Sequence, residues 1–132
     1  MTHPHEQLAR SEMEAAMRGD IEALLAHYTD DVVLYYPGRN PLSGTYRGKD
    51  EIRAWMSKVG ELLGEGGSLT RELEDVLASD DHAVQLVAVK ARRADGRSAR
   101  WFAAVVMHVR DGKISDLWVH IDNPYAVDEL LA

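Results

Sequence analysis

Three consecutive segments carry apolar residues at nearly every odd-numbered position: His82–Arg92, Trp101–Arg110 and Lys113–Ile121. A period of two is typical of β-strands, because successive side chains of a strand point to opposite faces of a sheet. The strings between them, Ala94–Gly96 and Arg110–Gly112, suit three-residue hairpin turns with glycine in the left-handed conformation and a bulge beside it. A two-residue turn is the alternative, and it would shift the pairing by one residue.

Three-residue turns place the odd-numbered residues of all three strands on one face. Over residues 83–91, 101–109 and 117–121 that face is apolar apart from the polar groups of Gln85 and Trp101, and it is expected to lie under helices. The even-numbered face mixes charges with large apolar side chains, a composition found at protein–protein interfaces. We therefore expect a homodimer formed sheet against sheet. Its predicted contacts are Phe102, Val106, Trp118 and His120.

The first half of the chain predicts helices. Apolar residues three and four apart predict one helix that ends at Gly19, a second capped by Asp20, and a third over about Asp50–Leu63. A short β-branched and aromatic run, Val32–Tyr36, predicts a strand, and the Pro- and Gly-rich stretch that follows predicts a loop over Arg39–Gly48. After the third helix, the alternating segment 69–77 predicts a further strand.

Composition excludes several kinds of protein. A chain of 132 residues with 45% hydrophobic residues is expected to form one domain over residues 1–132, ordered over about 7–130. With 22 acidic against 15 basic side chains, we expect no nucleic-acid partner. The chain has no cysteine and no His-Glu-x-x-His pattern, so we expect no metal and no cofactor. It has no long apolar run and no signal-peptide layout, so we expect a cytoplasmic protein without membrane contact.

The order of these elements resembles the nuclear transport factor 2-like superfamily, in its SnoaL-like branch of polyketide cyclases and ketosteroid isomerase relatives. The strings that carry the resemblance are Met17–Asp20, Tyr28–Val32, Pro37–Gly48 and Asp111–Ile114. The resemblance implies a cone-shaped α+β fold, with three N-terminal helices packed on a curved antiparallel sheet around a cavity. It does not imply one function, because this fold carries cyclases, isomerases, dehydratases, epoxide hydrolases and non-catalytic binding proteins.

The active residues of well-known members of this superfamily are mostly absent. Tyr36 stands where ketosteroid isomerases have their general base, and Glu12 stands near their oxyanion-hole tyrosine. Their protonated aspartate falls at Val105 or Met107, and the carboxylate of the epoxide hydrolases falls at Val119. The resemblance therefore disfavours both reactions in their known forms.

One string favours a cyclase instead. Trp118–Asp122 resembles the end of the last strand in polyketide cyclases of this branch, where an aspartate deprotonates a carbon next to carbonyls. Under this interpretation Asp122 is the base and His120 orients or relays a proton. The alternative is that Asp122 caps or begins the turn at Asn123-Pro124.

A cavity site is predicted around Tyr36. Its hydroxyl is expected near Glu12 and Tyr28, where it either donates a hydrogen bond to a ligand carbonyl or only fills volume. If Glu12 is buried, it needs Tyr36, Tyr28 or Gln85 as a partner. The predicted ligand-binding residues are Glu12, Tyr28, Trp55, Met56, Gln85, Trp101, Met107 and Val119.

Two functions follow from these residues. The first is a cofactor-independent cyclase or isomerase that transfers protons on a small hydrophobic or aromatic carbonyl compound, with Asp122 and Tyr36 as catalytic residues. The second is a non-catalytic ligand-binding or scaffold homodimer that keeps the cavity. The sequence leaves open whether the protein is an enzyme.

Overall fold

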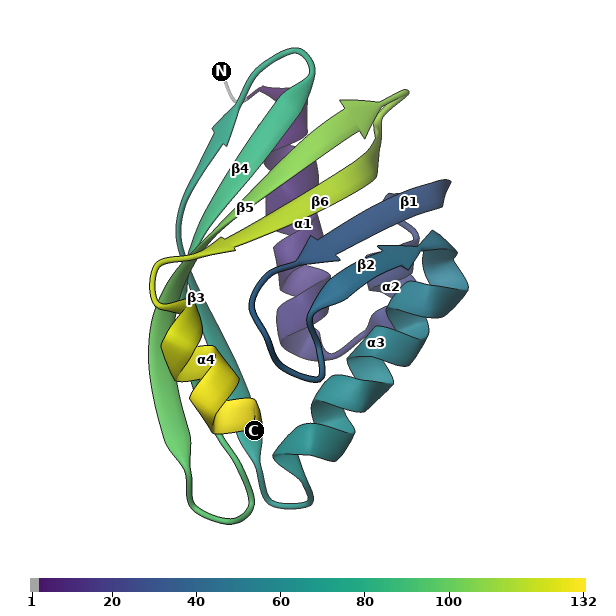
Figure 1. Cartoon of the computed structure of the whole chain (residues 1–132). Helices are drawn as coiled ribbons and strands as arrows, with labels where there is room; N and C mark the ends of the chain where they lie inside the picture. The colour runs from purple at the N-terminus through teal and green to yellow at the C-terminus, as the bar shows by residue number, and fades with distance from the viewer. Residues whose placement is uncertain (1–2) are drawn as a thin grey trace.

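The computed structural model describes residues 3–132, which form four helices and six strands (Figure 1). The helices are α1 (Pro4–Arg18), α2 (Ile21–Leu25), α3 (Gly48–Leu63) and α4 (Pro124–Leu131). The strands are β1 (Tyr28–Tyr36), β2 (Gly44–Arg47), β3 (Ser68–Ala78), β4 (His82–Arg92), β5 (Ser98–Arg110) and β6 (Lys113–Ile121). The predicted α+β class and the three N-terminal helices are confirmed, and a fourth helix ends the chain.

The strands form one sheet in the order β2-β1-β6-β5-β4-β3. Strands β3 to β6 are antiparallel neighbours, but β1 runs parallel to β6, so the sheet is mixed and not wholly antiparallel as predicted. Strand β2 lies in the stretch that was predicted to be a loop. Its four residues include a glycine and pair with the end of β1, and a strand this short has no recognisable period.

The predicted pairing of odd-numbered with odd-numbered residues in the long strands is confirmed. Val89 pairs with Trp101 and Val105 pairs with Val119, so odd-numbered residues face odd-numbered residues across β4, β5 and β6. The turn between β4 and β5 has the three predicted residues. Its last one, Gly96, has φ +95°, which is the left-handed region that favours glycine.

The turn between β5 and β6 differs from the prediction. Arg110 pairs with Lys113, so the turn has two residues, Asp111 and Gly112, and both have positive φ. A bulge one step further leaves Ser115 as the extra residue, so odd-numbered residues again pair with odd-numbered ones. The partners on β6 lie two positions further along than a three-residue turn would place them.

A second bulge, in β3, breaks the alternation predicted for that strand. The register shifts between Leu73 and Asp75, so the residues beyond the shift exchange faces. Val76 is therefore buried, whereas Leu77 is 53% exposed.

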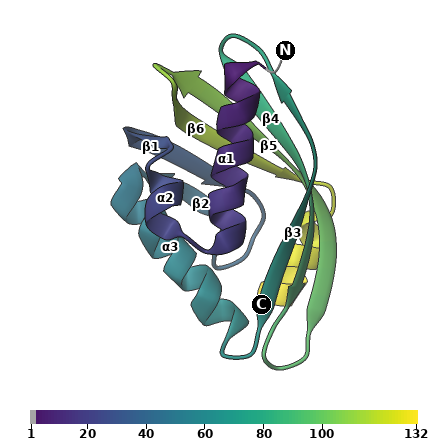
Figure 2. The same cartoon turned by 180° about the vertical axis from the view of Figure 1, so that it is seen from behind.

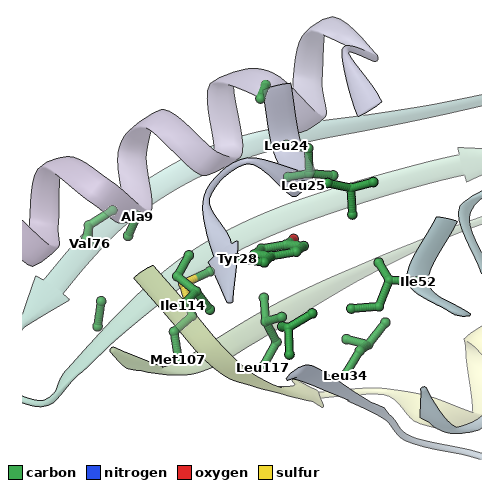
Figure 3. Close-up of a cluster of buried hydrophobic side chains, with 13 residues drawn as sticks. Ala9, Leu24, Leu25, Tyr28, Leu34, Ile52, Val76, Met107, Ile114 and Leu117 are labelled. Atoms are coloured by element: carbon green, nitrogen blue, oxygen red, sulfur yellow. The ribbon is translucent and has the colours of Figure 1, made fainter. Parts of the chain in front are cut away.

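The helices cover the apolar face of the sheet, with α1 packed on β3 and β4, and α3 packed on β1 and β2. Figure 2 shows α1 in front of the sheet. As predicted, Gly19 ends α1 with φ +71°, and Asp20 caps α2 by accepting a hydrogen bond from the Ala23 backbone N–H. Figure 3 shows the core between these layers, with Met107 and Ile114 fully buried beside the Tyr28 ring. In residues 3–132, no helix combines the length and the apolar content that crossing a membrane requires.

Candidate functional site

A cavity of about 150 Å³ lies between the apolar face of the sheet and the helices. An apolar cavity of about this size can hold a single aromatic ring. All predicted site residues except Asp122 and Met107 line it. Whether they contact a ligand stays a prediction. Among residues 3–132, no group of three or more His, Asp or Glu side chains is arranged to hold a metal ion.

The cavity wall contains a buried carboxylate, that of Glu12 on α1, which is 5% exposed. The Tyr28 hydroxyl donates a hydrogen bond to Glu12 Oε2 at 2.7 Å, and Gln85 Nε2 donates one to Glu12 Oε1 at 2.8 Å. The same Gln85 nitrogen also donates to the Ala9 carbonyl at 2.8 Å. The prediction that a buried Glu12 needs Tyr28 or Gln85 is confirmed. Tyr36, the third candidate, is not a partner.

The Glu12 network holds the carboxylate in one orientation. Burial, together with the charge and the hydrogen bond of Glu12, raises the pKa of Tyr28 well above its usual value. Tyr28 therefore stays a neutral donor at physiological pH. A carboxylate has about four lone-pair positions, so these two hydrogen bonds leave positions free on both oxygens of Glu12.

The sequence analysis missed Arg71, which lines the same cavity from β3. Within residues 3–132, Arg71 is the one cation and Glu12 the one carboxylate of the lining. The half-buried Arg71 side chain forms no hydrogen bond and no ion pair with the residues that the structure describes. Burial lowers the pKa of Arg71, and the nearby Glu12 and Tyr36 oppose that shift. The sequence did contain a signal for this position. Leu69 and Leu73 lie two positions away on either side, so Arg71 falls on the apolar face of its strand.

Tyr36, the last residue of β1, also lines the cavity. Its ring lies 5.2 Å from that of Trp55 between centroids. Burial raises the pKa of Tyr36 to about 12, with the Asp128 charge adding to the rise and the Arg71 charge opposing it. In the described part of the chain, its hydroxyl has no hydrogen-bond partner. The cavity thus holds a neutral phenol whose proton is free for a ligand.

The structure corrects the predicted position of Asp122. This residue is exposed at the end of β6, its carboxylate accepts a hydrogen bond from the Phe102 backbone N–H at 2.9 Å, and it is absent from the cavity wall. The reason is that side chains alternate along a strand, so the even-numbered Asp122 shares the outer face with Trp118 and His120. The alternative, that Asp122 begins the following turn, is closer to what is seen. Asn123 is the residue that caps α4.

The second correction concerns Met107, which was predicted to line the cavity. It is 0% exposed and packs in the core with Ile114 and Leu117, so it supports the sheet from within.

The C-terminal helix α4 closes one end of the cavity, where Leu130 and Leu131 form part of the wall. Asp128 Oδ1 accepts hydrogen bonds from the Arg39 backbone N–H at 2.9 Å and from Asn40 Nδ2 at 2.8 Å. These bonds tie α4 to the loop after β1. The sequence left open whether this segment closes the cavity or crosses to a partner subunit.

The chain is similar to known proteins in both sequence and structure. A family model described as a SnoaL-like domain matches residues 9–117. The chain is 31% identical over 127 residues to an uncharacterized protein of Mycobacterium tuberculosis, Rv0034, covering 95% of this chain and 94% of the relative.

Solved structures show the same fold. Bal32a, from a soil-derived mobile gene cassette, superposes with a TM-score of 0.90 at 25% identity and covers 98% of this chain and 97% of its own. An NTF2-like protein from Burkholderia pseudomallei superposes with a TM-score of 0.86 at 23% identity and covers 99% of both chains.

Proposed function

Because the chain belongs to the SnoaL-like domain family, we propose that its cavity binds a small ring-containing carbonyl compound and that Glu12 moves a proton on the carbon beside the carbonyl. Membership alone does not assign this chemistry, since one fold hosts many functions. The observation that carries the proposal is a single, hydrogen-bonded carboxylate in an otherwise mostly apolar wall. Glu12 is the base in this proposal, the role that the sequence analysis predicted for Asp122.

The mechanism uses three groups of the cavity. Glu12 removes a proton from the carbon beside the carbonyl, and the electron pair of that C–H bond moves to the carbonyl oxygen. The enolate oxygen is stabilised by donors already in place, the Tyr36 hydroxyl and the Arg71 guanidinium. Return of the proton to another carbon completes an isomerisation. In a cyclisation, the enolate carbon instead attacks a second carbonyl of the same molecule, and the electron pair of that C=O bond moves to its oxygen. Transfer of the proton from Glu12 to this alkoxide oxygen completes the reaction.

Deuterium exchange tests this without the natural substrate. In D₂O, the protons beside the carbonyl of 2-indanone are followed by NMR. The wild-type protein should accelerate their exchange, and Glu12→Gln should reduce the acceleration by about a hundredfold or more. Glu14→Gln is the matched control, because Glu14 is exposed on the same helix. Equal rates for wild type and Glu12→Gln would remove Glu12 from the reaction.

A non-catalytic binding protein is the second candidate. It is favoured by the hydrogen bond that each oxygen of Glu12 already accepts from the protein and by the position of Asp122 outside the cavity. This candidate predicts that 2-indanone shifts the NMR signals of Trp55 and Trp101 while its exchange rate stays that of buffer.

We also propose that the protein is a homodimer through the outer face of the sheet. On that face Tyr35 and Trp118 stack with ring centroids 5.5 Å apart, and Phe102 is 38% exposed. Phe102→Glu should convert a dimer to a monomer in sedimentation velocity at micromolar concentration. Tyr125→Glu, at an 81% exposed position on α4, should leave the dimer intact. A monomeric wild type would refute the proposal.

A further inference from the structure

We propose that the cavity selects ligands with an acidic oxygen group, a carboxylate or an ionised enol or phenol, and that Arg71 binds this group with Tyr36 beside it. The inference rests on the proposed function for the existence of the ligand site, and it adds the chemical class of the ligand.

Arg71 has no partner in the described part of the chain. Arg71 is half-buried in the wall of a mostly apolar cavity, where a guanidinium without a protein partner is less favourable than a paired one. Within residues 3–132, the Arg71 side chain has no hydrogen bond and no ion pair, although it belongs to the cavity wall. Its planar fork of five N–H donors matches the two oxygens of a carboxylate.

Glu12, the one carboxylate of the lining within residues 3–132, does not serve as the partner of Arg71. No ion pair joins the two side chains, and the two Glu12 oxygens already accept hydrogen bonds from Tyr28 and Gln85. The charge of Glu12 does favour the charged form of Arg71. Burial nevertheless has the larger effect, so the pKa of Arg71 is lowered. A ligand anion would supply the contact that the protein lacks.

Two hydrogen-bond donors, Arg71 and Tyr36, border the same cavity. Arg71 lies on β3 and Tyr36 on β1, strands that are separated in the sheet by β6, β5 and β4. Both side chains nevertheless line one cavity, and the charge of Arg71 acts on the Tyr36 phenol. The free donors of both residues therefore face the same ligand space. Within residues 3–132, Arg71 is the one cation of the lining, so the acidic end of a ligand is expected at Arg71 with Tyr36 beside it.

Benzoate and benzamide provide the test, since they have nearly the same shape and differ in charge. Calorimetric titration at neutral pH should show that wild type binds benzoate at least tenfold more tightly than benzamide. Arg71→Gln should abolish this preference and keep the benzamide affinity, and Arg71→Lys should retain part of the preference. Arg92→Gln, which removes an exposed arginine of neighbouring β4, should change neither affinity.

The outcomes separate this inference from the proposed function. Equal affinity of wild type for the two probes would overturn the inference while leaving a cavity that binds rings. A benzoate preference that persists in Arg71→Gln would also overturn the inference. Binding of neither probe would overturn both. A benzoate preference that depends on Arg71, in a protein that does not exchange 2-indanone protons, would support the inference and refute the catalysis. The wild-type comparison requires no variant to fold.

Discussion

Replacing Tyr28 with phenylalanine tests whether the Glu12 network holds the fold as well as the site. The change deletes one hydroxyl and leaves the ring in the core, so packing is kept (Figure 3). It removes a 2.7 Å hydrogen bond to a carboxylate that is 5% exposed. Hydrogen bonds to charged groups contribute about 1.5–3 kcal/mol to stability, and the Glu12 oxygen that loses its donor stays buried. We expect a loss of that size in the free energy of unfolding.

The loss can be measured as a change in melting temperature. Unfolding entropy of about 2.1 cal/mol/K per residue gives about 280 cal/mol/K for 132 residues. Each kcal/mol then lowers Tm by about 3–4 °C, so Tyr28→Phe should melt about 5–11 °C below wild type. Circular dichroism melts and urea titrations with an unchanged slope measure the effect.

Tyr36→Phe is the matched control, because it deletes the same atom where the hydroxyl has no partner among residues 3–132. It should change stability by less than about 0.5 kcal/mol. In a Glu12→Gln background, Tyr28→Phe should cost at least about 1 kcal/mol less than in wild type, because the charged acceptor is gone. Equal losses for the two tyrosines, or an unchanged cost in that background, would refute the reasoning.

Three further predictions concern Asp122, α4 and pH. Asp122→Asn should leave the 2-indanone exchange within about twofold of wild type, because the residue is outside the cavity; a loss comparable to that of Glu12→Gln would return Asp122 to the mechanism. Asp128→Ala removes two hydrogen bonds that hold α4 to the loop after β1, so it should lower the free energy of unfolding by about 1 kcal/mol in a urea titration. It should also speed ligand release, measured from NMR line shapes. Unchanged release would show that α4 does not gate the cavity. The pKa of Tyr36 is raised from 10.0 to about 12, so the unfolded chain releases this proton first and stability should fall as pH rises above 10. The loss is roughly 1 kcal/mol by pH 11, and Tyr36→Phe should remove it from the pH dependence of urea unfolding.

Local patterns in the sequence predicted much of the fold. The parity of residues in His82–Ile121 identified the buried face, and glycine and aspartate marked the end of α1 and the cap of α2. These features depend on near neighbours in the chain, so their period or spacing is visible without the tertiary structure. The partners of Glu12 could also be predicted, because a buried carboxylate needs hydrogen-bond donors and few candidate donors were expected near it.

The other features of the fold and the site could be seen only in the folded structure. The two bulges follow from how strands meet, and the one in β3 turns Val76 inward in place of Leu77. The match of Asp122 to a cyclase base was a match of residue type, whereas its direction depends on the face of β6 on which it falls. Arg71 has no partner among the described residues because of where all the side chains around it lie, on elements from α1 to β1. Tertiary structure decides such matters because they arise from distances between residues far apart in the sequence, which no local pattern records.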